Sequence, residues 1–391
     1  MAVPLPDAGT VNLVPPDLHE TELLARAVST AAAPPGGVTP VQRAVVNATV
    51  ESMSGFVLDV GELPPLGPDE FADAMRRRNS AFRERMVQIM LLLEMLLVPL
   101  PPEVTQRVET YAEALGVEDH MLRVTRKIAS GSLGLALIDF ERSGYFEKML
   151  ETPPEHLHTE RALAEAWEGV CGDDPLAARW SELVQCPEGS LGLGVWRFYQ
   201  ARGFTFPGSP GSAPPVLAQH DWIHVLADFG STVECEIEVF GFISRANDDP
   251  AGFSLLAMVL GLFETGYLFN AAKGFFAYDR GHMSRDTDRM ALRLADAMAR
   301  GANAAWYLDD HDRSGDTDFM AIDWFEYASW PLEAVRAHFG VPAKSPKAVA
   351  AGSVTPWEPG GISPFQYQHG REVAEQHGRA YDSFGATPPD A

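Results

Sequence analysis

The chain has 391 residues, a formal net charge of −24 at pH 7 and a hydrophobic fraction of 46%. This length suffices for two domains with sizeable cores, and the negative charge argues against a protein that binds nucleic acid or anionic membrane surfaces. Three cysteines without CxxC spacing predict neither a disulfide framework nor a zinc ribbon. Residues 1–10 lack the basic and apolar regions of a signal peptide, so we expect a cytoplasmic protein.

The first segment, residues 1–38, is rich in proline and alanine. We expect a mostly disordered tail there, with one short helix over residues 20–29. From residue 39 to residue 152 the apolar residues recur at helical spacing, which predicts a domain made only of helices. The predicted helices are 71–98, ended by the prolines of residues 99–102, and the shorter segments 104–114, 118–127 and 133–143.

The order of these helices, together with Leu115-Gly116-Val117 and residues 136–142, weakly resembles the helical domains of tellurite-resistance TerB-like proteins. A generic helical bundle explains the same pattern equally well. The substantial apolar stretches in the rest of the chain also have helical spacing or lie between helix caps. We therefore predict an all-α protein.

Two histidines and two carboxylates lie close together in the sequence between Gln219 and Glu236. On a helix, His220 and His224 lie one turn apart on the same face, and Asp221 lies beside them. The pattern breaks at Gly230, after which a second helix could fold back and bring Glu236 to the same ion. Such nitrogen and oxygen ligands suit Zn(II), with Fe(II) or Mn(II) as alternatives. The predicted divalent metal site comprises His220, Asp221, His224 and Glu236.

The alternative is that the two histidines only cap or pack the helix, while Asp221 is solvated and Glu236 forms a surface ion pair. The neighbouring residues disfavour this alternative, because polar groups on a buried helix must find partners. The apolar neighbours are Trp222, Ile223, Val225, Leu226 and Phe229.

The motif resembles the hallmark of the coenzyme Q (ubiquinone) biosynthesis protein 4 family, in which Glu follows His-Asp-x-x-His after eleven intervening residues. Three further stretches are similar to that family and occur in the family's order. Residues 187–204 resemble its proline-glycine turn and first helix, residues 281–285 its glycine-histidine-arginine segment, and residues 322–341 its closing segment. The resemblance covers residues 155–345.

This resemblance implies a metal-binding helical domain over residues 153–345 and a function in the biosynthesis of ubiquinone or a related prenylated quinone. The implied substrate is a prenylated aromatic precursor, and the implied reaction is oxidative decarboxylation of its ring. His282 and Arg285 are the candidate catalytic residues, which would bind the ring carboxylate or transfer a proton. The alternative for this pair is two surface residues at a helix start. Other quinone-biosynthesis proteins and the inner membrane surface are the expected partners.

The longest apolar stretch, Phe253–Phe276, is interrupted by Glu264, Asn270 and Lys273, so we do not expect it to span a membrane. We expect a buried helix, a groove for the prenyl chain or other lipid, or a homodimer contact. The family resemblance favours the groove.

Two features depart from the family pattern and place the substrate in doubt: the helical domain over residues 39–152 and a C-terminal extension over residues 346–391. Three function classes are therefore open. The first is a metal-dependent enzyme of quinone ring modification. The second is a non-catalytic lipid-binding scaffold for a quinone-biosynthesis complex, in which the metal stabilises the fold. The third is a metal-dependent hydrolase of an amphipathic substrate.

Overall fold

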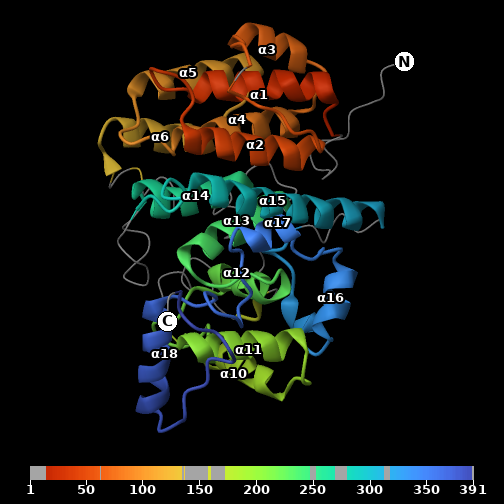
Figure 1. The fold of residues 1–391 in the computed structure, drawn as a ribbon, viewed down its shortest axis with the longest axis vertical. Helices are drawn as coiled ribbons and strands as arrows, with labels where there is room; N and C mark the ends of the chain where they lie inside the picture. The colour runs from red at the N-terminus through yellow and green to blue at the C-terminus, as the bar shows by residue number, and fades with distance from the viewer. Residues whose placement is uncertain are drawn as a thin grey trace. The chain divides into compact units, whose positions relative to one another are not determined.

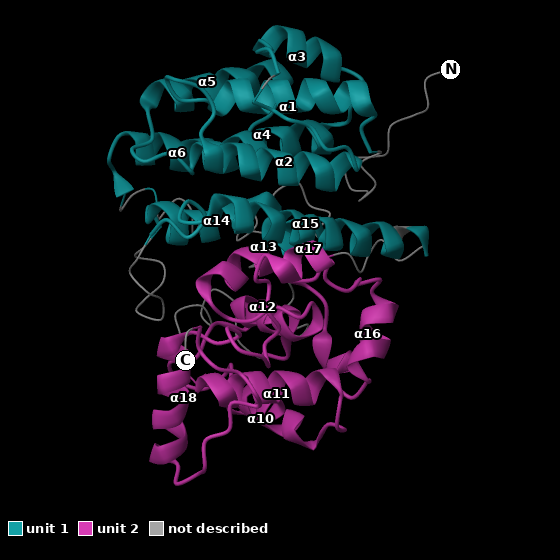
Figure 2. Ribbon diagram, viewed as in Figure 1, with its two compact units in different colours: residues 1–147, 240–317 teal, residues 148–239, 318–391 magenta. Residues whose placement is uncertain are grey.

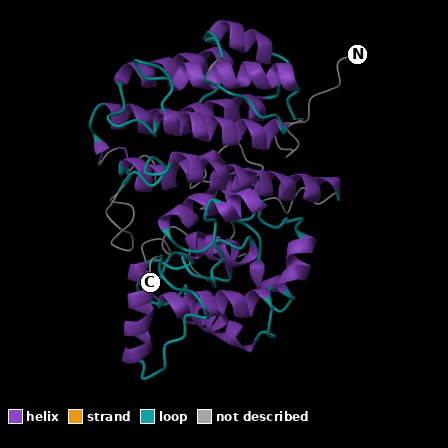
Figure 3. Ribbon diagram, viewed as in Figure 1, coloured by secondary structure: helices purple, strands orange, loops and turns teal. Residues whose placement is uncertain are grey.

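The computed structural model describes residues 15–61, 63–133, 136, 157–159, 172–246, 252–268, 280–311 and 318–389. All regular elements in these ranges are helices, so the all-α prediction is confirmed (Figures 1 and 3). Extended pairing in the same ranges is limited to two isolated bridges, Ser190 with Pro331 and Pro359 with Thr387. None of the described helices combines the length and the apolar character needed to cross a bilayer.

The chain forms two compact units (Figure 2). Unit 1 comprises residues 1–147 and 240–317, and unit 2 comprises residues 148–239 and 318–391. The predicted domain boundary at residue 152 lies close to the first crossing between the units. However, the region predicted as one domain over residues 153–345 is divided, because residues 240–317 belong to unit 1.

Unit 1 is a helical assembly in which α15 packs along α2, and α4 packs against α1, α5 and α14. Proline at the first helical position and side-chain caps define most of the helix starts. Its helices are α1 (Leu18–Ala32), α2 (Pro40–Ser54), α3 (Pro68–Met75), α4 (Ser80–Glu94), α5 (Pro102–Leu115), α6 (Met121–Ala129), α14 (Phe253–Leu260), the π-helical turn η4 (Gly261–Thr265) and α15 (Thr287–Asp310).

Two predictions for the N-terminal helices are corrected. The expected short helix at residues 20–29 extends over Leu18–Ala32 and is buried along one face, so the disordered tail expected through residue 38 is wrong for this segment. The helix predicted over residues 71–98 is two helices, α3 and α4, because the Asn79 side chain accepts a hydrogen bond from the Phe82 amide and caps a new helix. The helix predicted over residues 133–143 lies almost wholly outside the described residues.

Unit 2 is built around α11, which packs against α12, α18 and η2. In its aromatic core, the Trp180 ring contacts Tyr199, Trp222 and Phe325, and Trp222 also contacts Phe325. Its elements are α10 (Asp174–Ser181), η2 (Glu182–Gln185), α11 (Leu191–Arg202), α12 (Pro215–Leu226), the start of α13 (Val233–Ala246), η7 (Trp324–Tyr327), α16 (Leu332–His338), α17 (Pro346–Ala350) and α18 (Pro364–Gln376).

The C-terminal extension is an integral part of unit 2. Helix α18 lies against α11, where Gly370 approaches the backbone so closely that a Cβ there would lie 2.3 Å from the Ala201 carbonyl oxygen. Residues 354–361 contact the turn between α12 and α13. The extension therefore contributes to the core around the predicted metal site.

Candidate metal site

Helix α12 brings three of the predicted ligands together. It begins at Pro215, and its sixth, seventh and tenth residues are His220, Asp221 and His224. One ligand atom from each of these side chains lies within 4.8 Å of the other two. The cluster is buried: Asp221 is 5% exposed and His224 is 0% exposed.

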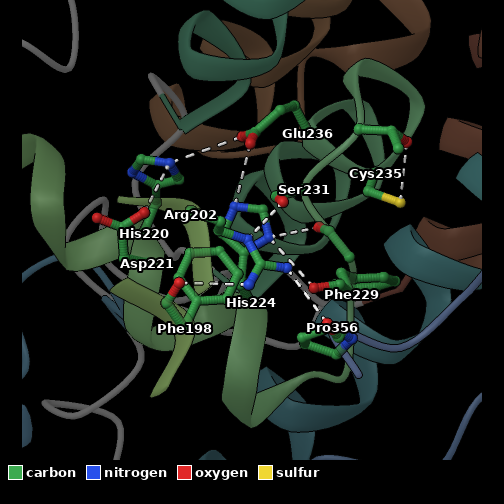
Figure 4. A network of polar contacts seen from close by, with 12 residues as sticks. Phe198, Arg202, His220, Asp221, His224, Phe229, Ser231, Cys235, Glu236 and Pro356 are labelled. Carbon is green, nitrogen blue, oxygen red and sulfur yellow. Dashed lines mark hydrogen bonds and ion pairs between the residues drawn. The ribbon is translucent and has the colours of Figure 1, made fainter. Parts of the chain in front are cut away.

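Helix α13 adds the fourth predicted ligand, Glu236, whose carboxylate faces both imidazoles (Figure 4). The Oε1 atom of Glu236 lies 3.3 Å from Nε2 of His224, and its Oε2 atom lies 3.6 Å from Nε2 of His220. Glu236 is itself 6% exposed. The structure thus brings all four predicted ligands together.

Both imidazoles are fixed by backbone carbonyls. His224 Nδ1 donates to the Gly230 carbonyl oxygen at 2.7 Å and lies 3.3 Å from that of Phe229. His220 Nδ1 donates to the Leu217 carbonyl oxygen. Because a carbonyl oxygen can only accept, the proton of each neutral ring is on Nδ1, and Nε2 keeps its lone pair. Both Nε2 atoms point toward the carboxylates, as in metal-ligating histidines held by outer hydrogen bonds.

Tyr199 on α11 fixes the Asp221 carboxylate. The tyrosine hydroxyl donates to Oδ2 of Asp221 at 2.5 Å, while Oδ1 lies 3.5 Å from Nε2 of His220. Burial, followed by the neighbouring Asp221 charge, raises the pKa of Tyr199 well above its ordinary value. Tyr199 therefore stays protonated and acts as a hydrogen-bond donor, which leaves Oδ1 directed to the cluster.

The electrostatics of the pair His224 and Glu236 favour opposite charges. Burial lowers the pKa of His224, but the Glu236 carboxylate overcomes this effect and the net pKa is raised. Burial raises the pKa of Glu236, but His224 and then His220 overcome it and the net pKa is lowered. His224 Nε2 is a buried atom whose nearest ion-pair contact is Glu236 Oε1, at 3.3 Å. A buried imidazole nitrogen that faces the carboxylates of Asp221 and Glu236 is suited to act as a ligand of a cation.

The buried guanidinium of Arg202 contacts the same phenyl ring as His224, that of Phe198. The Phe198 ring stacks on the imidazole with centroids 5.0 Å apart, and the Arg202 guanidinium carbon lies 3.7 Å from the centroid of the same phenyl ring. Burial lowers the pKa of Arg202 to about 9, against the opposing charges of Tyr381 and Asp221, so Arg202 is charged at neutral pH. No local pattern in the sequence indicated this residue.

Comparisons with known proteins identify no family. No family model matches the chain, and no curated protein matches it. Among solved structures, a Nostoc punctiforme protein provisionally assigned to ubiquinone biosynthesis is similar, with 16% identity and a TM-score of 0.29 over 68% of this chain and 99% of that chain. A similarity at this level carries no conclusion about the function of this protein.

Arg336 stabilises the C-terminal end of α12. Its Nε donates to the Leu226 carbonyl oxygen at 2.8 Å and its Nη2 to that of Val225 at 3.2 Å, and Nη2 also lies 3.3 Å from Asp228. A cation at this end complements the helix dipole and satisfies carbonyls that have no partner within the helix. The sequence placed Arg336 in the segment that resembles the family, but it did not indicate this contact.

His282 and Arg285, the predicted catalytic residues, belong to unit 1, whereas the four predicted ligands belong to unit 2. His282 is buried with its ring against Phe263, and Arg285 is exposed. Their segment is tied to η4 by the Glu264 carboxylate, which accepts from the Met283 amide at 2.8 Å. The catalytic role of this pair therefore stays a prediction.

Proposed function

We propose that this protein binds a divalent metal ion through His220, Asp221, His224 and Glu236 and acts on a prenylated aromatic precursor in the biosynthesis of ubiquinone or a related quinone. The observation that carries the metal part is the convergence of two Nε2 atoms and two carboxylates in one buried cluster. The resemblance of residues 155–345 to the coenzyme Q biosynthesis protein 4 family supports the substrate class.

The four side chains fit a divalent cation in charge as well as in geometry. Two neutral imidazoles and two carboxylates balance a dication, which matters because unpaired buried charges are costly. Zinc fits this set, and iron or manganese fits it as well. When bound, such an ion supplies Lewis acidity, which draws electron density from an aromatic ring that carries a carboxylate.

The residues of the chain prepare the site for that chemistry. Backbone carbonyls direct both Nε2 atoms inward, and Tyr199 leaves Asp221 Oδ1 available. The surrounding core excludes water from His224, whereas His220 has 13% of its side chain exposed and is the most accessible of the four side chains. We therefore place the approach of substrate at His220.

The substrate part is tested by mass spectrometry of small molecules extracted from the purified full-length protein. We expect a prenylated aromatic acid in the extract, with less of it from His224→Ala. His377→Ala is the matched control, because His377 is exposed at the C-terminal end of α18 and its side chain contacts the Val373 carbonyl through Nδ1, away from the cluster. The control should retain the ligand.

The same ligand, supplied with dioxygen, distinguishes an enzyme from a scaffold. Release of the ring carboxyl group as carbon dioxide by the parent protein, and not by His224→Ala, would support oxidative decarboxylation. Retention of the unchanged ligand would support a binding role only. An extract without any prenylated aromatic compound, together with hydrolysis of an amphipathic ester, would contradict the proposed substrate class.

A further inference from the structure

The turn between α12 and α13, residues 227–232, contains the hydrogen-bond acceptors of His224. The carbonyl oxygens of Phe229 and Gly230 fix its Nδ1, at 3.3 and 2.7 Å. The position of this turn therefore determines the direction of Nε2, the atom that faces Glu236.

Residues 354–366 of the C-terminal extension hold that turn by four hydrogen bonds, the weakest of which joins the Ser231 hydroxyl to the Gly361 carbonyl at 3.4 Å. The Gly230 amide donates to the Val354 carbonyl at 2.9 Å, and the Ser231 amide donates to the Gly361 carbonyl at 3.0 Å. The Ser231 hydroxyl donates to Gln366 Oε1 at 2.7 Å. The two backbones touch, because a Cβ on Gly230 would lie 2.9 Å from the Gly361 Cα atom. We call residues 354–366 the C-terminal clamp.

Arg202 connects the clamp to the turn and to α11 (Figure 4). Its Nε donates to the Ser231 hydroxyl at 2.6 Å, and its Nη2 donates to the carbonyls of Gly361 at 2.9 Å and Pro356 at 3.3 Å. Its Nη1 atom donates to the carbonyl of Phe198, the residue whose ring stacks on His224. A fully buried guanidinium with this many acceptors is a rigid connection, because its planar fork is preorganised.

We propose that the C-terminal clamp, joined through Arg202, is a positioning device that sets the His224 imidazole for metal binding. This inference rests on the proposed function. The clamp lies outside residues 155–345, so the resemblance to a known family does not supply it. The extension, residues 346–391, belongs to unit 2. Its backbone supplies hydrogen-bond acceptors for the turn at residues 227–232, which α12 and α13 do not provide.

Gln366→Ala is the variant that breaks the clamp without changing any predicted ligand. Gln368→Ala is its matched control, because Gln368 lies on the same helix and its amide bonds only the exposed Glu372, at 2.8 Å. Gln366→Glu is the rescue variant. It keeps an acceptor oxygen for Ser231 and for the Ser363 amide, which caps α18.

The readout is cobalt(II) binding by the full-length metal-free protein, followed by visible ligand-field absorption and by competition with a chelator. Circular dichroism first establishes a temperature at which every variant is folded. We expect Gln366→Ala to bind cobalt up to about tenfold more weakly. This is the lower end of the loss seen when a direct partner of a ligating histidine is removed, because Gln366 acts on His224 through Ser231 and the turn. Gln368→Ala should match the parent, and Gln366→Glu should recover most of the affinity.

A merely structural role for the clamp would lower the unfolding temperature of Gln366→Ala while leaving the cobalt affinity and spectrum of the folded protein unchanged, and that result would overturn the inference. If the parent protein itself binds no cobalt, the proposed function fails and the inference fails with it. The two failures are distinguishable. A failure of the proposed function is seen in the parent protein, whereas a failure of this inference alone is seen in the comparison of Gln366→Ala with the parent. Nitrogen-15 NMR of the metal-free protein, at an alkaline pH where the His224 ring is neutral, adds an independent measure: the parent should show the proton on Nδ1, and Gln366→Ala should show a mixture of tautomers.

Discussion

At the scale of single residues, the hydroxyl of Tyr199 is the most directly testable contact around the cluster. It donates to Asp221 Oδ2 at 2.5 Å inside the core. Tyr199→Phe would leave that carboxylate oxygen without its donor, which typically costs about 1–3 kcal/mol of stability. It should also weaken zinc binding by about tenfold, because the freed carboxylate can turn away from the cluster. Urea unfolding and a chelator competition measure the two effects.

Tyr381→Phe is the control for this prediction. The Tyr381 hydroxyl donates to the Ala201 carbonyl at 2.9 Å, so this variant also loses one hydrogen bond of unit 2, but none to a predicted ligand. It should lower stability without changing zinc affinity. Equal zinc affinity in Tyr199→Phe and the parent would show that the tyrosine does not orient Asp221.

The sequence was sufficient to predict the four clustered residues, and it was not sufficient to predict what orients them. Spacing within one helix determines which side chains share a face, so His220, Asp221 and His224 could be read directly from the sequence. Tyr199 and Arg202 come from another helix, and no local periodicity states which residue of one helix will face another. Their contacts depend on how α11 packs against α12.

At the scale of elements, α4 contains a buried acid that should make the stability of unit 1 depend on pH. Glu94 is 0% exposed, so its carboxyl group is removed from solvent. Burial raises its pKa from 4.5 to about 8; the Glu109 charge adds to this effect, while the Thr125 and Thr105 hydroxyls and Arg107 only partly oppose it. The folded state therefore holds a proton on Glu94 at pH values where the unfolded chain releases it.

This raised pKa determines the sign of the pH dependence. The stability contributed by protonated Glu94 is fully present below about pH 4.5 and is lost as pH rises through about 8. Between pH 6 and 9 we expect the free energy of unfolding to fall by an amount on the order of a few kcal/mol. Glu94→Gln, which cannot ionise, should remove most of this fall, as measured by urea unfolding at several pH values.

Glu103→Gln is the control, because Glu103 is an exposed acid in the first turn of the adjacent helix α5. It should leave the pH dependence unchanged. If Glu94→Gln and the parent show the same slope of stability against pH, Glu94 is not the group responsible.

Helix boundaries show the limit of periodicity at this scale. The apolar residues from Phe71 to Leu97 repeat with helical spacing through the break at Asn79, so the pattern alone predicts one helix. The local signal for the break was Asn79, which lies in a capping position. Its side chain competes with the backbone hydrogen bonds that would continue the helix. For α1, the proline- and alanine-rich composition predicted disorder, but the small alanine residues allow close packing in the core.

At the scale of the whole molecule, the chain crosses between its two units more than once. The sequence suggested a boundary at residue 152 and a separate extension after residue 345. Instead, residues 240–317 join the N-terminal helices, and the extension completes unit 2. A linear pattern could not reveal this division, because α13 continues without a break through the point where the chain passes from unit 2 to unit 1.

Metal content tests the central claim most directly. The full-length protein should be purified without added metal and without a metal-binding affinity tag, beside the double variant His220→Ala, His224→Ala and the surface control His377→Ala. We expect about one zinc, iron or manganese ion per chain in the parent and in the control, and none in the double variant. Absence of metal from all three proteins, when each is folded, would contradict the account and leave the four residues as a buried polar cluster.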